Sequence, residues 1–317
     1  ILLVAGKGHE KIQEIGNRKI YFSDKKIILN AIKLKNLSLS NNLKLNLIKE
    51  SSGNKKLNTN LTLGQARINS KEVKKNDIFF AIRGRKNDGN KFVEEALKKK
   101  ASIVVVNKIK KKLDYKKQIK VIDSLKFLTE TSTIFRENID AKIIAITGSC
   151  GKTTLKELLG KTLKKISKTT ISPKSYNNKY GVPLSLFNLS KNDNYGVLEV
   201  GMDKKGEIDY LSKIIKPDIS VITNINYAHA KNFKNIKDIA LAKSEIISNT
   251  KPNGFVILNA DDNFFRLHQK IATKNNINTI SFGIKNPKSD VKLINIIKIY
   301  NNFKITIKTK DFKKSFV

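Results

Sequence analysis

Cysteine and histidine are nearly missing from this chain, and their scarcity excludes two kinds of structural site. The 317 residues include one cysteine, Cys150, and three histidines. One cysteine cannot build a disulfide framework, and a zinc site of cysteine and histidine needs more ligands than the sequence offers. This composition is typical of a reducing compartment, so we expect a cytoplasmic location.

Long apolar runs are also missing. No segment approaches the roughly 20 apolar residues of a membrane span, and the first residues lack the order of a signal peptide. We therefore expect no membrane partner. The hydrophobic fraction of 39% still suffices for ordinary buried cores, and the length allows two domains.

Acidic residues are few: 27 aspartates and glutamates stand against 63 lysines and arginines, which gives a formal net charge of +36. Such a charge suggests nucleic-acid binding. The lysines, however, are scattered over nearly every segment, without a basic patch interleaved with aromatic residues. The compositional bias of an AT-rich genome explains them better. We expect no nucleic-acid partner, although a positive field would help to attract a polyanionic nucleotide.

The most informative segment that is present is Gly148-Ser149-Cys150-Gly151-Lys152-Thr153-Thr154. The continuous apolar run before it, 143–147, is typical of a strand buried on both faces of a parallel sheet. The segment after it predicts an amphipathic helix. On this helix we expect Leu155, Leu158, Leu159 and Leu163 to pack on the sheet, and Lys156, Glu157, Lys161 and Lys164 to face water. A turn at this place presents unpaired backbone N–H groups to phosphate oxygens.

The residues of the glycine-rich segment have separate expected tasks in binding ATP. Gly148 and Gly151 let the backbone approach the phosphates, Lys152 reaches the β and γ oxygens, and the Thr153 hydroxyl ligates Mg²⁺. The motif is shorter than the standard one, because Ile146 stands where the first glycine is usual. A plain glycine turn is the alternative. The required order of strand, glycines, lysine, threonines and helix favours the phosphate site.

Strand-like runs alternate with helical segments along the chain. A first unit has a strand at 77–82, a helix at 92–100 and a strand at 101–106. Further strand-like runs lie at 143–147, 196–200, 219–223, 255–259 and 279–282. The alternation predicts an α/β fold: a small α/β domain, then a doubly wound, mostly parallel central domain of the P-loop ATPase type. Ligands of such sheets bind beyond the carboxyl ends of the strands.

Polar residues stand near those carboxyl ends. Glu199 ends an apolar strand, where an unpaired carboxylate costs much free energy, and its oxygens suit Mg²⁺ beside a triphosphate. An ion pair with one of the many lysines is the alternative. His229 follows another strand end and is either a metal ligand or a structural histidine. Lys243 lies on a predicted helix, and composition alone makes it one solvated lysine among many.

Taken together, these motifs resemble those of the Mur ligases, the ATP-dependent amide ligases of peptidoglycan precursor synthesis. The resemblance runs from about Leu61 to the end, with motif order and spacing in agreement throughout. The motifs are 146–153, 176–178, 181–183, 199–201, 206–208, 223–225, 228–229, 242–246 and 259–262. Ser149 and the pair Ala228-His229 favour the member that joins D-alanyl-D-alanine to UDP-N-acetylmuramoyl-tripeptide.

The resemblance implies ATP and Mg²⁺ as cofactors and gives roles to individual residues. Residues 148–154 would bind the ATP phosphates, and Asn259 the adenine side of the nucleotide. The implied metal ligands are Thr153, Glu199 and His229, and the implied catalytic residues are Lys152, Glu199, His229 and Lys243. Several members carry the lysine matching Lys243 as a carbamate. The implied substrate-binding residues are Ser70, Asn177 and Asn178.

The resemblance also divides the chain. Residues 61–140 match the amino-terminal domain that holds the UDP-sugar substrate, and residues 141–317 a central ATP-binding domain that stops before its close, without the third domain. Residues 34–60 indicate a linker or divergent lead-in. Residues 1–33 resemble the carboxyl end of the diaminopimelate-adding Mur ligase, where residues matching Gly6 and Glu10 help to recognise the amino acid.

These ends, and a start at Ile1 rather than methionine, predict a monomeric piece of two fused ligases, or an artificial joining, that lacks full activity alone. Lys231 departs from the family pattern, which often has an acid two places after the histidine. Other ligases of this fold, the diaminopimelate-adding enzyme or a folylpolyglutamate synthase, remain alternatives. A non-catalytic nucleotide-binding protein is the alternative from another class.

Overall fold

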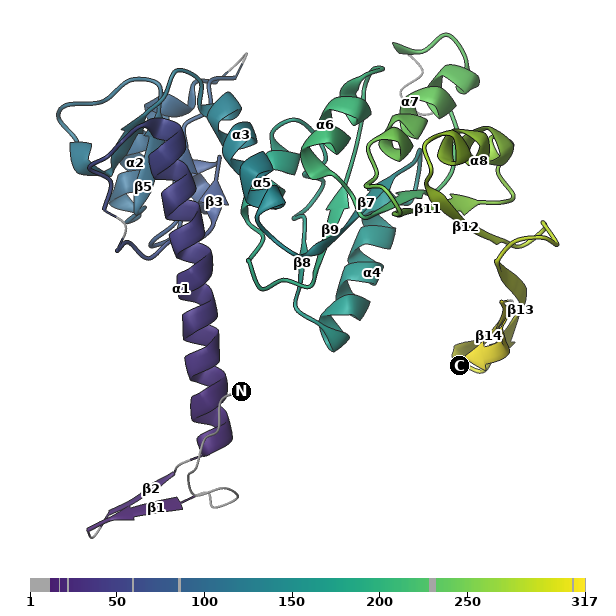
Figure 1. Cartoon of the computed structure of the whole chain (residues 1–317), viewed down its shortest axis with the longest axis horizontal. Helices are drawn as coiled ribbons and strands as arrows, with labels where there is room; N and C mark the ends of the chain where they lie inside the picture. The colour runs from purple at the N-terminus through teal and green to yellow at the C-terminus, as the bar shows by residue number, and fades with distance from the viewer. Residues whose placement is uncertain are drawn as a thin grey trace.

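The computed structural model shows a mixed α/β protein built on two parallel sheets (Figure 1). It describes residues 12–16, 18–21, 23–58, 60–84, 87–227, 232–309 and 311–316. Gly6, Glu10 and His229, to which the sequence gives binding roles, lie outside these ranges, as does Lys231.

The first described residues form a hairpin and a long helix. Strands β1 (Ile12–Ile15) and β2 (Arg18–Tyr21) pair antiparallel, and helix α1 (Asp24–Ser52) follows. The helix starts at Ser23, whose side chain accepts a hydrogen bond from a first-turn N–H, and ends at Gly53 in a left-handed conformation. No described helix, α1 included, is long and apolar enough to cross a membrane.

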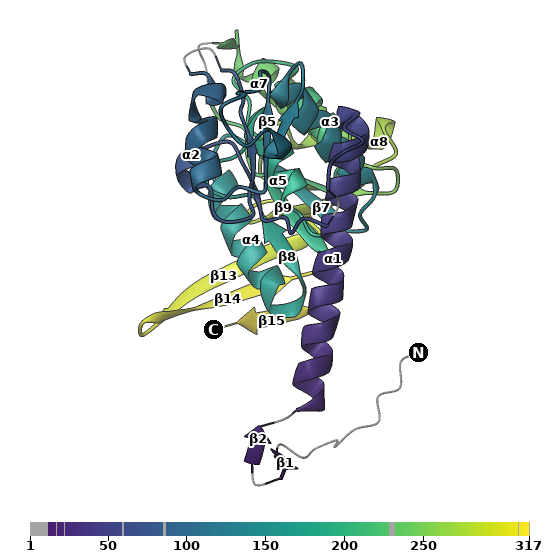
Figure 2. The same ribbon diagram turned by 90° about the vertical axis from the view of Figure 1, so that its left-hand side faces the viewer.

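Residues 34–52 of the expected linker or divergent lead-in are helical, and the boundary expected at residue 33 lies inside helix α1. Leu45 and Ile48 in its second half are fully buried in the main core, whereas Ile27 and Leu34 in its first half are exposed. The first half extends away from the rest of the protein (Figures 1 and 2). Only half of the helix has a buried side, so an apolar periodicity over its whole length is missing.

The first sheet contains four described strands in the order β3-β4-β5-β6, all parallel. Its strands are β3 (Ala66–Arg67), β4 (Ile78–Phe80), β5 (Ile103–Val106) and β6 (Gln118–Lys120). The helical segments of this unit are η1 (Ser70–Glu72), η2 (Gly89–Phe92), α2 (Val93–Lys98) and η3 (Tyr115–Lys117). The predicted strand, helix and strand at 77–106 are confirmed, each shorter than expected. Helix α3 (Ser124–Glu137) leads to the second sheet.

The second sheet has the order β15-β14-β13-β12-β11-β10-β7-β9-β8 over the described residues. Its strands are β7 (Lys142–Thr147), β8 (Thr169–Ile171), β9 (Tyr195–Glu199), β10 (Ile219–Ile222), β11 (Phe255–Asn259), β12 (Asn278–Gly283), β13 (Val291–Ile299), β14 (Asn302–Lys308) and β15 (Lys313–Phe316). Its helices are α4 (Lys152–Ile166), α5 (Gly181–Phe187), α6 (Glu207–Ile215), α7 (Ile236–Ser248) and α8 (Phe265–Lys274). Pairing is parallel from β8 to β13 and antiparallel from β13 to β15.

Strand β7 is buried on both sides, which confirms the interpretation of its continuous apolar run. Ile144 and Ile146 pack in the cluster that includes the leucines of α4, whereas Ile143 and Ala145 pack in the larger cluster with residues of α5, α6 and α7. Helices therefore cover both faces of the sheet, and the predicted doubly wound, mostly parallel arrangement is confirmed.

The predicted sides of α4 are confirmed for its packed leucines and for the exposed Lys161 and Lys164, but two positions are reversed. Lys156 is fully buried, whereas Leu158 is 62% exposed. A Cβ added at Gly160 would lie 2.4 Å from Cδ1 of Ile171, so the helix lies against β8 along the side that carries Lys156 and Gly160. The sequence prediction counted only large apolar residues as buried. It therefore missed a buried side that contacts β8 through a glycine, and it placed Lys156 in water.

The two units share one apolar core. Phe80 of the first sheet contacts Phe187 of α5, with ring centroids 5.9 Å apart and near-perpendicular rings, and Phe187 also contacts Phe135 of α3. Such aromatic pairs stabilise a contact beyond the area they bury. The first unit is thereby packed beside the carboxyl end of α5.

Candidate active site

The glycine-rich segment connects the end of β7 to the start of α4, as the sequence predicts. Gly148 has φ of 143°, and a Cβ there would lie 1.9 Å from the Thr223 hydroxyl oxygen. Gly151 has φ of 81° and is the N-cap of α4, with open space around it. At position 148, glycine is therefore required both because a side chain would collide with Thr223 after β10 and because φ is positive. At position 151, only the positive φ requires glycine.

Residues just after β10 fix the shape of this loop. The Asn224 side chain accepts a hydrogen bond from the Cys150 N–H at 3.1 Å, and the Asn224 carbonyl accepts one from the Ser149 N–H at 2.9 Å. The Thr223 hydroxyl donates to the Cys150 carbonyl at 2.6 Å, and Ser149 Oγ accepts from the Asn226 N–H at 2.8 Å. The loop is thus held open at the amino end of α4, where the helix dipole favours an anion.

Lys152 and the two threonines begin α4. The Lys152 ammonium donates to the carbonyls of Gly148 and Ser149, at 2.8 and 3.3 Å, so it lies over the loop. Thr153 and Thr154 are exposed in the first turn, where backbone N–H groups have no partner within the helix. This arrangement can bind the phosphates of a nucleotide.

Glu199 at the end of β9 is 1% exposed and accepts two hydrogen bonds from neutral groups. The Thr153 hydroxyl donates to Oε2 at 2.7 Å, and the Asn177 side-chain amide donates to Oε1 at 2.8 Å. The alternative of an ion pair is not found: no described lysine or arginine contacts this carboxylate. A buried carboxylate beside a hydroxyl is a donor set of hard oxygens that fits Mg²⁺. The described residues contain no cluster of three histidine, cysteine or acidic side chains.

Lys243 on α7 is 2% exposed, which corrects the interpretation of this side chain as a solvated lysine. Burial, and then the nearby charge of Lys152, lowers the pKa of Lys243 to about 8. Among the described residues, none accepts a hydrogen bond from its ammonium. The neutral, nucleophilic amine of Lys243 is therefore reached at mildly basic pH, lower than for an ordinary lysine.

Lys152, Lys243 and the Asn177 partner of Glu199 line one cavity of about 580 Å³. The residues that line it are Lys152, Asn177, Asn178, Lys179, Tyr180, Gly201, Met202, Asp203, Lys204, Lys205, Gly206, Glu207, Tyr210, Leu211 and Lys243. Sequence reasoning missed Lys179, Lys204 and Lys205, because three lysines carry no signal in a chain that has lysine in nearly every segment. Together with Lys152 and Lys243 they outnumber the acidic Asp203 and Glu207 of the lining, so the cavity favours anions.

The two asparagines expected to bind substrate already have structural partners. Asn177 contacts Glu199, and the Asn178 side-chain oxygen accepts from the N–H groups of Tyr180 and Gly181 at 3.0 and 3.1 Å, at the start of α5. Asn178 is exposed and lines the cavity. The backbone of 176–181 is thereby fixed where it borders the cavity.

Asn259 and Ser70 are not brought into this cavity. Asn259 ends β11 at the same edge of the sheet, and its side chain donates to the Thr223 carbonyl at 3.4 Å. Ser70 is buried in the first unit, and its hydroxyl donates to Glu95 at 2.7 Å. Lys99 donates to the Ser70 carbonyl at 3.0 Å. The described contacts of Ser70 are therefore internal to the first unit.

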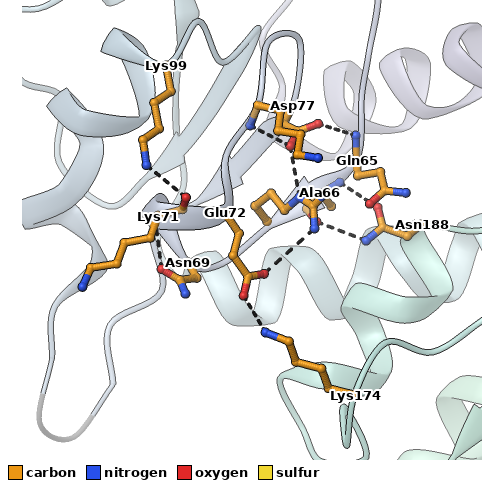
Figure 3. Close-up of polar contacts among 11 residues, drawn as sticks. Gln65, Ala66, Asn69, Lys71, Glu72, Asp77, Lys99, Lys174 and Asn188 are labelled. Carbon is orange, nitrogen blue, oxygen red and sulfur yellow. Dashed lines mark hydrogen bonds and ion pairs between the residues drawn. The ribbon is translucent and has the colours of Figure 1, made fainter.

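A polar junction joins the first unit to the segment between β8 and α5 (Figure 3). Lys174 donates to Glu72 at 2.8 Å, and Arg67 contacts the other oxygen of Glu72 at 4.0 Å. The hydrogen bond from Lys174 lowers the pKa of Glu72. Asn188 pairs with Ala66 through both backbone groups, at 2.7 Å to its N–H and 3.1 Å to its carbonyl. Asn188 thus takes the place of a neighbouring strand at the edge of β3.

Known proteins share both units of this fold. A family model described as the Mur ligase middle domain matches residues 146–316, and one described as the Mur ligase family, catalytic domain, matches residues 65–136. The UDP-N-acetylmuramoyl-tripeptide--D-alanyl-D-alanine ligase of Buchnera aphidicola subsp. Acyrthosiphon pisum is 39% identical over 241 residues, 76% of this chain and 52% of the relative. The ligase of that name from Rickettsia prowazekii is 36% identical over 239 residues, 75% of this chain and 53% of the relative.

Solved structures give the same result. MurF from Acinetobacter baumannii superposes with a TM-score of 0.74 and 29% identity, over 86% of this chain and 59% of that one. The MurF ligase from Thermotoga maritima in complex with ADP has a TM-score of 0.68 and 29% identity, over 81% of this chain and 58% of that one. The chain spans about half the length of the curated relatives it matches.

Proposed function

This chain belongs to the Mur ligase family, and we propose that it binds ATP and a UDP-linked peptide for the ligase reaction that joins D-alanyl-D-alanine to UDP-N-acetylmuramoyl-tripeptide. Two full-length relatives carry that name, and a relative of similar fold was solved with ADP. The observation that carries the proposal is the group of Thr153, Glu199 and Asn177 beside the phosphate loop, with Lys243 buried at the same cavity.

In the proposed reaction, a carboxylate oxygen of the peptide attacks the γ-phosphorus of ATP. The bond from this phosphorus to the β-γ bridging oxygen breaks, which gives an acyl phosphate and ADP. The amine of D-alanyl-D-alanine then attacks the acyl carbon, phosphate leaves, and the amine loses a proton. Each step needs charge to be stabilised on the transferred phosphoryl group.

The phosphate loop supplies most of that stabilisation. Backbone N–H groups of residues 148–154 would bind phosphate oxygens, and the Lys152 ammonium would turn from the loop carbonyls toward the γ-phosphate. Asn259, at the same sheet edge, would contact the adenine side. Thr153 and Glu199, together with His229, would hold Mg²⁺, which when bound draws electron density from the phosphate oxygens.

Lys243 and the two asparagines would complete the site. As a carbamate, Lys243 would become an anion that faces the lysines of the cavity instead of a cation that repels Lys152. Asn177 and Asn178 would position the peptide carboxylate near the γ-phosphorus. The first unit, which includes Ser70, would hold the UDP-sugar. We further propose a monomer in a reducing cytoplasm, where the exposed Cys150 would remain a free thiol.

Lys152→Ala in the full-length protein tests this proposal. We expect ADP formation to fall by at least about 100-fold, while affinity for the UDP-linked peptide stays within about threefold, because Lys152 acts on the phosphates only. Lys161→Ala, which alters an exposed lysine on the same helix, is the matched control.

Normal turnover by Lys152→Ala would overturn the assignment of the phosphate site. The choice of amine tests the rest of the proposal. ADP release with diaminopimelate or glutamate, but not with D-alanyl-D-alanine, would make the protein another ligase of this fold. ATP binding without ADP formation, whichever amine is supplied, would make it a nucleotide-binding protein without ligation.

A further inference from the structure

A buried lysine outside the motifs lies between the phosphate-loop helix and the segment that carries Asn177. Lys156 on α4 is fully buried. Its ammonium donates to the Ser172 carbonyl at 2.8 Å and to the Lys174 carbonyl, and it lies 3.4 Å from a carboxylate oxygen of the half-exposed Glu157. Burying an ammonium is costly unless such acceptors surround it, so the carbonyls of the 172–174 backbone are strongly bound to this side chain.

The segment 172–178, which we call the β8–α5 loop, is bent at the point that Lys156 contacts. Lys174 has φ of 49°, a left-handed conformation that costs a non-glycine residue on the order of 1–2 kcal/mol. This conformation turns the Lys174 carbonyl toward Lys156. The buried hydrogen bond therefore offsets the strain of the bend, and without the ammonium the loop would favour another path.

The far end of the β8–α5 loop reaches the candidate metal site. The Asn177 carbonyl accepts from the Gly201 N–H at 2.8 Å, and the Asn177 side chain donates to Glu199 at 2.8 Å. At the near end, the Ser172 hydroxyl accepts from the Glu199 N–H at 3.3 Å. Lys156 thus contacts the carbonyls of Ser172 and Lys174 in a short segment whose two ends both bond to Glu199 or its neighbour Gly201, although Lys156 itself does not line the cavity.

We propose that Lys156 is a positioning residue: through the carbonyls of Ser172 and Lys174 it sets the β8–α5 loop so that Asn177 orients Glu199 for a metal–nucleotide complex. The inference deepens the proposed function at the same site and rests on it. It assigns no contact between Lys156 and ATP, substrate or metal. The Glu72 contact with Lys174 (Figure 3) places the first unit on the same loop from outside.

Hydrogen exchange of the loop in Lys156→Met tests the structural half of the proposal without any ligand. We expect the amides of Tyr176, Asn177 and Gly201 to exchange at least about tenfold faster, while that of Val256 in the sheet is unchanged. Lys161→Met, an exposed lysine on α4, should change none of them. Unchanged protection of the three amides in folded Lys156→Met would overturn the proposal.

ADP titrations of the same chain, with and without Mg²⁺, test the functional half. In Lys156→Met we expect ADP affinity without Mg²⁺ to be unchanged, since the phosphate loop is intact. The increase in ADP affinity on adding Mg²⁺, which we call the Mg²⁺ gain, should fall at least about fivefold. Asn177→Ala should lose the same gain, and the double variant should lose no more than either single variant. An additive loss in the double variant, or a full gain in Lys156→Met, would contradict the inference.

Two further outcomes are decided in advance. If the unaltered chain shows no Mg²⁺-dependent ADP binding, the proposed function fails, and the exchange rates still decide whether Lys156 sets the loop. If Lys156→Met does not fold, Lys156→Gln replaces it, because its amide keeps two N–H donors at slightly shorter reach. If Lys156→Gln keeps both the exchange protection of the loop and the Mg²⁺-dependent increase in ADP affinity, a neutral donor at this position suffices to set the loop. If it keeps the protection but loses the increase in ADP affinity, the proposed coupling is overturned.

Discussion

Two regions of the central unit each bury a lysine, and their surroundings differ. Lys156 lies among carbonyl oxygens on the inner side of the β8–α5 loop, whereas Lys243 lies at the cavity beside Lys152. Carbonyl oxygens stabilise an ammonium, whereas a cationic neighbour and burial destabilise it. Burial alone therefore does not identify a reactive lysine. The groups around it decide whether the amine is structural or chemically available.

The largest expected effect is the loss of ligation activity when Lys243, the lysine at the cavity, is replaced. Lys243→Met in the full-length protein should lower the rate of ligation by at least about 100-fold, with little change in thermal stability, because the side chain serves the cavity and has no described hydrogen-bond acceptor. Steady-state ADP release and a melting curve measure the two quantities. Lys237→Met, which changes an exposed lysine on α7, is the control. Wild-type turnover by Lys243→Met would remove Lys243 from the site.

The next effect concerns the pH dependence of the Lys243 amine. The pKa of Lys243 is lowered to about 8, so its neutral form is the minor form at pH 7 and the major form above pH 8. Only the neutral amine combines with CO₂, and we expect a carbamate signal that grows severalfold from pH 7 to 8.5 at constant dissolved CO₂. ¹³C NMR with labelled CO₂ measures it. The signal should disappear in Lys243→Met and persist in Lys156→Met; the opposite result would exchange the roles of the two lysines.

A moderate effect is expected at the junction between the two units. Asn188→Ala removes both hydrogen bonds to Ala66, which is 1% exposed, and leaves its buried N–H without a partner. We expect a loss of about 1–3 kcal/mol in the free energy of unfolding. Urea denaturation measures the loss, with Asn301→Ala, at an exposed turn, as control. A change no larger than that of the control would mean that the shared aromatic core alone joins the units.

The smallest effect is expected at the ion pair that reaches the β8–α5 loop from outside. The side chains of Lys174 and Glu72 are 71% and 31% exposed, so Glu72→Gln should cost no more than about 1 kcal/mol of stability. High salt should reduce even that difference. If Glu72→Gln instead altered loop exchange as strongly as Lys156→Met, the outer contact rather than the buried lysine would set the loop.

Much of the fold followed from local sequence patterns. The run 143–147 predicted a doubly covered strand and the structure shows one, because a strand without a water-facing side has no polar alternation. Helix α1 was missed over residues 34–52, because the described apolar side chains of its first half are exposed and its second half packs on elements far along the chain. The side of α4 was misassigned at Lys156 and Leu158 for a similar reason.

The candidate site divides in the same way. The spacing of the glycine-rich segment predicted a phosphate-binding turn. A charged residue at the end of an apolar strand singled out Glu199 as a candidate metal ligand. The predicted roles of all the site residues stay predictions, and Gly6, Glu10 and His229 also lie outside the described ranges. Lys156 had no signal, because it is one lysine on an amphipathic helix of a lysine-rich chain. Lys243 had a signal only through the family motif at 242–246, since composition alone made it a solvated lysine.

The sequence by itself determined the elements whose chemistry is local: the buried strand, the phosphate loop that follows it, and the helix that begins at Lys152. Backbone conformation and spacing of three or four residues are enough for these. Only the tertiary structure decided that Asn177 contacts Glu199, and that one buried lysine faces carbonyl oxygens while another faces a cation. Those environments are made by segments distant in sequence, and the electrostatics of a buried charge depend on which groups packing brings to it.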